Sequence, residues 1–193
     1  WAETNGYDDV MDWYDIYFND NTMTKYYFDE KWHDTKKIVE EFNIKNNISI
    51  YDTITYTHHG PVVWDYNYQT ASIGAKSSKG HRPRQTSMGR ALRWQAHDAT
   101  NEIKSFFNIN KATTYIDFTN ALKDFSCPGQ NFAYIDRKNI AIWHAGNPPI
   151  KWYGQGQFIG DGRDPMYEWG LPIPHNEKAH SLNPIQGFLS SAN

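Results

Sequence analysis

The stretch Gln130 to Gly146, QNFAYIDRKNIAIWHAG, contains two short apolar runs, at 132–135 and 140–143. A polar break at 136–139, DRKN, separates them and is short enough for a tight turn. Aromatic and branched residues on both sides of such a turn predict two antiparallel strands. Because nearly every position in both runs is apolar, we expect both faces of this hairpin to be covered. The stretch therefore predicts the central hairpin of a layered domain.

The rest of the chain is predicted to contain mostly strands, with two helices before the hairpin. Short alternating or apolar runs predict strands at 11–18, 25–28, 35–42, 48–57, 62–64 and 91–94. The first helix is expected at 99–107, with Ile103, Phe106 and Phe107 on one side, and the second at 114–124. In the second helix Tyr115, Phe118, Leu122 and Phe125 follow helical spacing. Residues 147–174 are rich in Pro and Gly and favour no long element. The predicted class is α+β, with residues 1–193 forming a single domain.

Composition excludes some classes of function. The 193 residues carry a formal net charge of -3, which gives no overall electrostatic footprint for nucleic acid. A basic loop holds Lys76, Lys79, Arg82 and Arg84, but without interleaved aromatics a solvated loop is favoured over a phosphate contact. No apolar run approaches the roughly 20 residues that span a bilayer. The single cysteine excludes an internal disulfide and a cysteine-based zinc site.

The acidic residues, the histidines, the cysteine and the serines are each candidates for a functional site because of their chemistry. Asp9 and Asp12 flank the backbone carbonyl of Met11 in an acidic stretch that also holds Asp8 and Asp15, and hard cations such as Ca²⁺ prefer several oxygen ligands. By itself this stretch favours a solvated acidic turn. The eight histidines show no HExxH or other metal-ligand spacing, and His59 is interpreted as a structural residue at a strand end. Cys127 has no base beside it and is interpreted as an inert thiol. No serine lies in a GxSxG motif.

Six segments, in order along the whole chain, resemble the nucleophile-bearing chain of the penicillin acylases, a family of N-terminal-nucleophile hydrolases. They are WAETNGYDDVMD at 1–12, THHGPVVWD at 57–65, ALRW at 91–94, FSCPGQNFAYIDRKNIAIWHAGNPP at 125–149, GDGRDPMYEWGLPIP at 160–174 and NPIQGFLSSAN at 183–193. The resemblance implies an αββα fold, in which two antiparallel sheets stack between helices. It also implies hydrolysis of amides in N-acyl compounds, such as β-lactam side chains or acyl-homoserine lactones. In that family an N-terminal serine attacks the amide and its own α-amine, with a pKa of about 8, acts as the base.

The resemblance carries specific roles over to this chain, although the nucleophile is not among them. The first residue is Trp1, which cannot be a nucleophile. We therefore expect an internal piece of a larger acylase that needs the rest of the acylase chains and is inactive alone. The resemblance implies an oxyanion hole made by the backbone N–H of Asn5 and the side chain of Asn193. Asn5 replaces a smaller residue common in relatives, which narrows the expected pocket.

The resemblance also bears on metals, location and assembly. It implies a structural Ca²⁺ bound by Asp9, the Met11 carbonyl and Asp12, with a weaker match at Gly162, and it implies no organic cofactor. The family is commonly exported, so a periplasmic or extracellular location is expected. No nucleic-acid or membrane partner is expected, and sheet surface left uncovered in a piece of the fold favours self-association.

A different class of function stays open on the residues alone. An aromatic-rich binding module for sugars or peptides would use Trp143, Trp152, Tyr153 or Trp169 as a stacking platform. A relative of the acylases that has lost its nucleophile and acts as a scaffold is a third interpretation. A Ser, Thr or Cys at a self-cleavage point upstream of Trp1 would distinguish the acylase from both.

Overall fold

The computed structural model describes residues 1–65 and 87–191, which form two compact units. The helical unit comprises Trp1–Val10, Trp94–Tyr153 and Trp169–Asn193, and the strand-rich unit comprises Met11–Arg93 and Gly154–Glu168. Each unit draws on separate stretches of the chain. The single domain over 1–193 stays a prediction. Among the described residues, no helix has the length and apolar character needed to cross a membrane.

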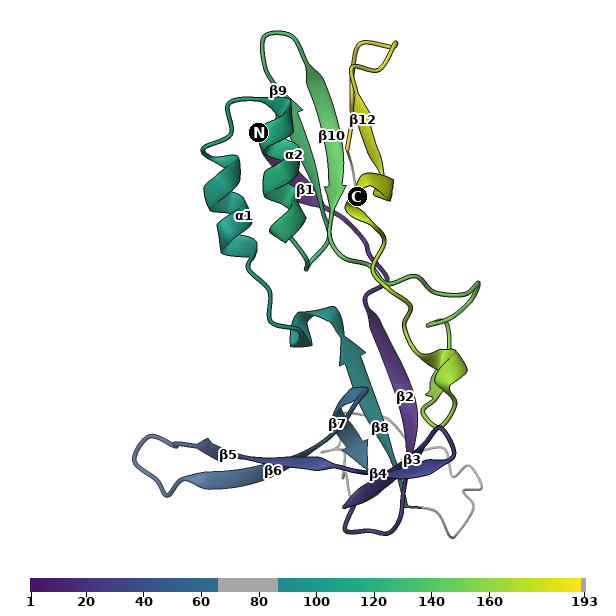
Figure 1. Ribbon diagram of the computed structural model, residues 1–193. Helices are drawn as coiled ribbons and strands as arrows, with labels where there is room; N and C mark the ends of the chain where they lie inside the picture. The colour runs from purple at the N-terminus through teal and green to yellow at the C-terminus, as the bar shows by residue number, and fades with distance from the viewer. Residues whose placement is uncertain (66–86, 192–193) are drawn as a thin grey trace, which may run out of the picture. The chain divides into compact units, whose positions relative to one another are not determined.

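The helical unit packs two helices against an antiparallel sheet (Figure 1). The sheet has the order β1-β9-β10-β12, and its strands are β1 (Ala2–Asn5), β9 (Gln130–Ile135), β10 (Ile140–Ala145) and β12 (His180–Leu182). The helices are α1 (Glu102–Ile109) and α2 (Tyr115–Ala121), and a 3₁₀ turn, Leu122–Asp124, continues α2. One helical layer on one sheet is therefore seen in this unit.

The predicted hairpin is present as β9 and β10, with the expected turn. The Asp136 carboxylate accepts hydrogen bonds from the backbone N–H groups of Lys138 at 2.6 Å and Asn139 at 2.7 Å. An aspartate that binds the backbone two residues ahead stabilises a tight turn, which explains the polar break at this point.

The prediction that both faces of the hairpin are covered is wrong for the described residues. Phe132 and Trp143 are buried in the core with Phe118, Leu122 and Phe125. On the opposite face of β9, Ala133 and Ile135 are exposed. Alternate residues of a strand point to opposite faces, and α1 and α2 pack on one face only, so an apolar run is half exposed here.

The second helix is confirmed, and the buried face of the first is predicted in part. Phe106 packs against the core as expected, but Ile103 and Phe107 are exposed, whereas Ser105 and Ile109 are buried. The Glu102 carboxylate accepts hydrogen bonds from the backbone N–H groups that precede the hairpin, at Ser126 and Cys127, both at 3.3 Å. This contact at the first turn fixes the rotation of α1, so the face at positions 105 and 109 meets the core.

The strand-rich unit contains a mixed sheet of the order β4-β3-β2-β8-β7-β6-β5, with β11 paired in parallel to β2. Its strands are β2 (Met11–Phe18), β3 (Lys25–Phe28), β4 (Lys31–Asp34), β5 (Lys36–Phe42), β6 (Ile50–Thr57), β7 (Gly60–Asp65), β8 (Ser87–Trp94) and β11 (Gly160–Asp161). Alternate residues of β2 form the core, where Tyr14, Ile16 and Phe18 pack with Tyr26 and Ala91. The strands predicted in the first half of the chain are thus confirmed within a few residues.

Candidate functional site

Asn5 is the last residue of β1, the edge strand of the sheet in the helical unit, and lies opposite Gln130 of β9. The next residue, Gly6, donates its N–H to the Gly129 carbonyl at 2.9 Å. Hydrogen-bonded and non-bonded pairs alternate along an antiparallel ladder. Asn5 is therefore at a non-bonded position, and its N–H points away from β9. A backbone donor directed outward at a sheet edge is what an oxyanion hole requires.

A chain of polar side chains lies behind Asn5. Asn131 Nδ2 donates to the Asn5 carbonyl at 3.4 Å, and Asn131 Oδ1 lies 2.7 Å from His144 Nδ1. The other ring nitrogen, His144 Nε2, lies 2.7 Å from Asp8 Oδ1, and both side chains are mostly buried. Both nitrogens of His144 are therefore held by oxygen atoms, one from an amide and one from a carboxylate. Asp8 and His144 lie 136 positions apart, so no local pattern in the sequence predicts their contact.

Close packing around this chain depends on two glycines. A Cβ on Gly6 would lie 2.6 Å from His144 Cε1. A Cβ on Gly129 would lie 2.0 Å from Asp8 Oδ2 and 2.6 Å from Asp8 Cγ. The backbone at Gly6 and Gly129 thus lies so close to the Asp8–His144 pair that neither position has room for a side chain. Because Gly6 follows Asn5, the position of Asn5 depends on this packing.

Asn193, the second predicted oxyanion residue, lies outside the described residues. Ser191 is among the described residues, and its Oγ lies 2.5 Å from the Oγ1 of Thr4, which is the residue before Asn5. The end of the described chain therefore reaches β1 beside the proposed donor.

The predicted calcium ligands are divided between the two units, which are described separately. Asp9, in the helical unit, is exposed and forms an ion pair with Lys151 at 2.9 Å. Met11 and Asp12 start strand β2 rather than lying in a loop, and Asp12 is 4% exposed. The Gly162 carbonyl lies 3.1 Å from His59 Nε2, so one of its lone pairs faces that ring. The ligand set stays a prediction.

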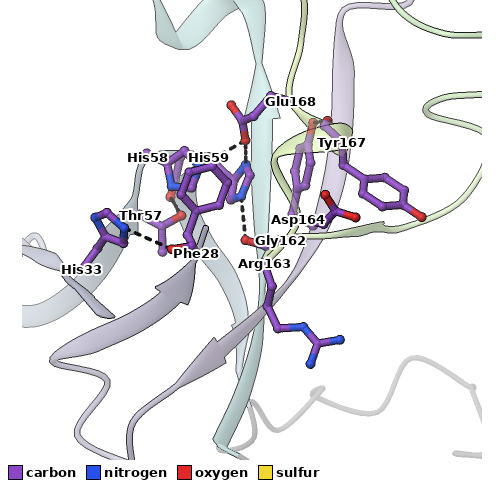
Figure 2. Close-up of polar contacts among 12 residues, drawn as sticks. Phe28, His33, Thr57, His58, His59, Gly162, Arg163, Asp164, Tyr167 and Glu168 are labelled. Atoms are coloured by element: carbon purple, nitrogen blue, oxygen red, sulfur yellow. Dashed lines mark hydrogen bonds and ion pairs between the residues drawn. The ribbon is translucent and has the colours of Figure 1, made fainter. Parts of the chain in front are cut away.

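Two adjacent histidines and a distant glutamate form a second polar cluster, entirely within the strand-rich unit (Figure 2). His58 and His59 are the two residues that connect β6 to β7, where Thr57 pairs with Gly60. Neighbours in a strand point to opposite faces, but a turn reverses the chain, so both rings reach the same carboxylate. His58 Nε2 and His59 Nδ1 each lie 3.1 Å from Glu168 Oε1.

The charges of this cluster follow from its burial. His59 is 2% exposed, and burial together with the neighbouring His58 lowers its pKa to about 4. Burial raises the pKa of the Glu168 carboxyl, but the hydrogen bond with His58, followed by smaller electrostatic interactions with the two histidines, outweighs this and lowers the pKa below its usual value. At neutral pH the cluster thus holds a neutral His59 beside a glutamate that is ionised. The interpretation of His59 as a structural residue at a strand end missed this arrangement. The His-His doublet at a predicted turn was a signal, but nothing in the sequence pointed to Glu168.

The other candidates gain little from the structure. Burial, with the charges of Glu102 and Asp8, raises the pKa of the Cys127 thiol, which agrees with an inert thiol. Trp143 is buried and stacks against His175 and His180, so the prediction that it belongs to a ligand-stacking platform is wrong. The platform would rest on Trp152, Tyr153 and Trp169 alone. The basic loop with Lys76, Lys79, Arg82 and Arg84 lies outside the described residues.

Comparison with proteins of known sequence and structure places these observations in a family. An acyl-homoserine lactone acylase, QuiP, of Pseudomonas aeruginosa is 28% identical to the chain over 172 residues, which are 87% of this chain and 19% of the relative. A protein of the same name from Pseudomonas fluorescens is 22% identical over 163 residues, covering 84% of this chain and 18% of the relative. The chain therefore spans about a fifth of the length of these relatives.

A solved structure confirms the predicted fold class. The thermostable penicillin G acylase from Alcaligenes faecalis matches with a TM-score of 0.76 at 21% identity, over 100% of this chain and 32% of that one. The family described as Penicillin amidase matches residues 1–193, the whole of the sequence. The chain belongs to the penicillin amidase family.

Proposed function

We propose that the protein carrying this chain hydrolyses the amide bond of N-acyl compounds and that this chain supplies the stabilising half of the active site. The family match over residues 1–193 is the observation that carries the proposal. The nucleophile, an N-terminal serine exposed by self-cleavage, is assigned to a part of the protein outside this chain. The 193 residues alone are then inactive.

The Asn5 N–H is proposed as one donor to the developing oxyanion. Its outward direction at the edge of β1 supports this role, because a donor already paired within the sheet would have to break that bond first. Removing one such donor typically reduces kcat by about 10²–10³.

The Asn193 side chain is proposed as the second donor. The contact between Ser191 and Thr4, the residue before Asn5, supports this assignment. Two donors from opposite ends of the chain would bind one oxygen, as acyl transfer requires.

Acyl-homoserine lactones are the first substrate class to test, because the relative at 28% identity carries that name. A β-lactam with an amide-linked side chain is the second, after the name of the matched structure. Both contain a secondary amide, whose carbonyl oxygen the proposed oxyanion donors would recognise equally. An assay that measures release of the acid or the amine product distinguishes the two substrate classes, because their acyl and amine groups differ.

A structural Ca²⁺ is proposed for the same protein. The donors assigned to it are all oxygens, from Asp9, the Met11 carbonyl and Asp12, which suits a hard cation. Asp12 is a buried carboxylate on the inward face of β2, and a cation near it would offset the cost of burying its charge. A carbonyl from Gly162 would add a fourth oxygen through its remaining lone pair.

The decisive experiment uses the protein with its processed nucleophile and replaces Asn5 by proline. Proline removes the backbone N–H together with the Asn side chain, and an edge strand tolerates it where that N–H points away from its neighbour. We expect kcat for an acyl-homoserine lactone to fall by about 10²–10³ for Asn5→Pro, with the fold retained. Asn5→Ala keeps the N–H and should retain most of the activity. Equal activity in the Pro and Ala variants would refute the role of this donor, and no release of amine from any N-acyl substrate would refute the function.

A further inference from the structure

We propose that His58, His59 and Glu168 form a binding site for a divalent first-row transition metal ion such as Zn²⁺ or Co²⁺. The site lies wholly in the strand-rich unit and is separate from the residues assigned to calcium and to the oxyanion. It does not depend on the proposed amide hydrolysis.

The separations between the three donor atoms suit one ion. Zinc bonds of 2.0–2.1 Å at tetrahedral angles place neighbouring ligand atoms about 3.3–3.4 Å apart. His58 Nε2 and His59 Nδ1 each lie 3.1 Å from Glu168 Oε1, and one donor atom from each of the three residues lies within 4.8 Å of the other two. The two nitrogen–oxygen separations are therefore within a few tenths of an ångström of those around a zinc ion.

The outer nitrogens of both rings are already held by oxygen atoms. His59 Nε2 lies 3.1 Å from the Gly162 carbonyl, and His58 Nδ1 lies 3.0 Å from the Tyr26 hydroxyl (Figure 2 shows the first). Metal-binding histidines commonly donate the other ring N–H to a carbonyl or a similar acceptor, which fixes the tautomer and aims the lone pair at the ion. With an ion bound, that tautomer would direct the lone pairs of His58 Nε2 and His59 Nδ1 toward the ion beside Glu168.

Both nitrogens of His59 face oxygen atoms, one at the Gly162 carbonyl and one at Glu168. When the N–H of His59 points at the Gly162 carbonyl, the lone pair on its other nitrogen points toward the carboxylate oxygen 3.1 Å away. A cation placed near these two atoms would bind both of them.

Aromatic neighbours hold the ligands in place. Tyr14 stacks on His59 with ring centres 4.0 Å apart, and the ring centres of Phe28 and His58 are 4.1 Å apart. Glu168 follows a 3₁₀ turn, Pro165–Tyr167, and its carbonyl accepts a hydrogen bond from Gln155 at 3.2 Å. Ligands fixed in this way lose little conformational freedom when an ion binds.

The donor set decides the class of metal. Two imidazole nitrogens and one carboxylate oxygen favour zinc, cobalt or nickel, whereas Ca²⁺ and Mg²⁺ prefer oxygen alone. His58 and Glu168 are partly exposed, which gives the ion an entry path and leaves room for water as a further ligand.

A bound ion would join the turn between β6 and β7 to a residue 110 positions further along the chain. Such a link stabilises the folded state as the ion concentration rises. At an ion concentration about 100 times Kd we expect Tm to rise by about 5–10 °C.

The test is titration of the untagged protein with Zn²⁺ by calorimetry, and with Co²⁺ by visible absorption, in the presence of excess Ca²⁺. The variants are His58→Ala and Glu168→Gln, which replace partly exposed ligands and leave the buried His59 in place. His33→Ala is the matched control, because His33 contacts the Phe28 carbonyl at 3.2 Å beside the site without being a ligand.

We expect one Zn²⁺ per chain, Co²⁺ absorption bands with nitrogen ligation, and a rise in Tm, all retained in His33→Ala. His58→Ala and Glu168→Gln should each weaken binding by about tenfold or more and abolish the rise in Tm. Absence of stoichiometric binding to the wild-type protein would overturn the proposal. Wild-type affinity in both ligand variants, or equal loss in His33→Ala, would overturn it as well.

Discussion

Replacing Gly129 by alanine tests whether the buried Asp8–His144 pair supports the backbone beside Asn5. The new Cβ would lie 2.0 Å from Asp8 Oδ2 and 2.6 Å from Asp8 Cγ, so the carboxylate must turn away. The hydrogen bond to His144, 2.7 Å long and mostly buried, is then lost. A hydrogen bond to a charged group contributes about 1.5–3 kcal/mol. With some residual strain, we expect Gly129→Ala to cost about 2–4 kcal/mol of the free energy of unfolding.

A double-mutant cycle with Asp8→Ala isolates this cause. In the Asp8→Ala background the two closest of the three nearest atoms are removed, and the Cβ of residue 8, at 3.3 Å, is the one that remains. Gly129→Ala should then cost less than about 1 kcal/mol, which gives a coupling energy of about 1–3 kcal/mol.

The assay is urea unfolding followed by circular dichroism at the helix band. Among the described residues both α-helices belong to the helical unit, so this signal reports on the unit that contains the substitution. An equal cost of Gly129→Ala with and without the Asp8 carboxylate would show that the clash has another origin and would refute the reasoning.

Two further predictions concern the helices. Thr114 caps α2, because its hydroxyl accepts a hydrogen bond from the backbone N–H three residues further along. Thr114→Ala should lower the free energy of unfolding, measured with urea, by about 1 kcal/mol. Thr114→Ser keeps the hydroxyl and should retain most of this stabilisation. Burial raises the pKa of the Glu102 carboxyl, but hydrogen bonds from Thr100, Ser126 and Cys127 outweigh it, so the pKa is lowered in the folded state. A lowered pKa adds stability that is complete above the unfolded value of about 4.3 and disappears as pH falls through the folded value. The stability difference between wild type and Glu102→Gln should therefore shrink as pH falls below about 5, and a constant difference from pH 7 to pH 3 would contradict the assignment.

Local signals in the sequence were sufficient for most elements. The turn at Asp136 and the helix begun by Thr114 each depend on side chains that bind backbone groups two or three residues away, so a short stretch contains all the information. Strand β2 was predicted for the same reason, because its alternate residues Tyr14, Ile16 and Phe18 mark the buried face.

The buried faces were predicted less well, since they depend on what packs against an element. Ile103 and Phe107 form an apolar stripe on α1, yet the contact of Glu102 with residues 126 and 127 turns a neighbouring stripe to the core. Ile135 continues an apolar run of β9 and is exposed, because α1 and α2 cover the other face of the sheet. Neither outcome is encoded in the spacing of the residues themselves.

The sequence by itself determined the family and the α+β class, since six ordered motifs and local hydrogen-bonding patterns can be read along the chain. The oxyanion and calcium residues stay predictions that follow from the family resemblance. Only the tertiary structure decided which way the Asn5 N–H points, that Asp8 meets His144, and that His58 and His59 share Glu168. These contacts join residues separated by more than 100 positions. Such pairs become neighbours only when strand register and turn geometry bring distant segments together, and no local pattern records that event.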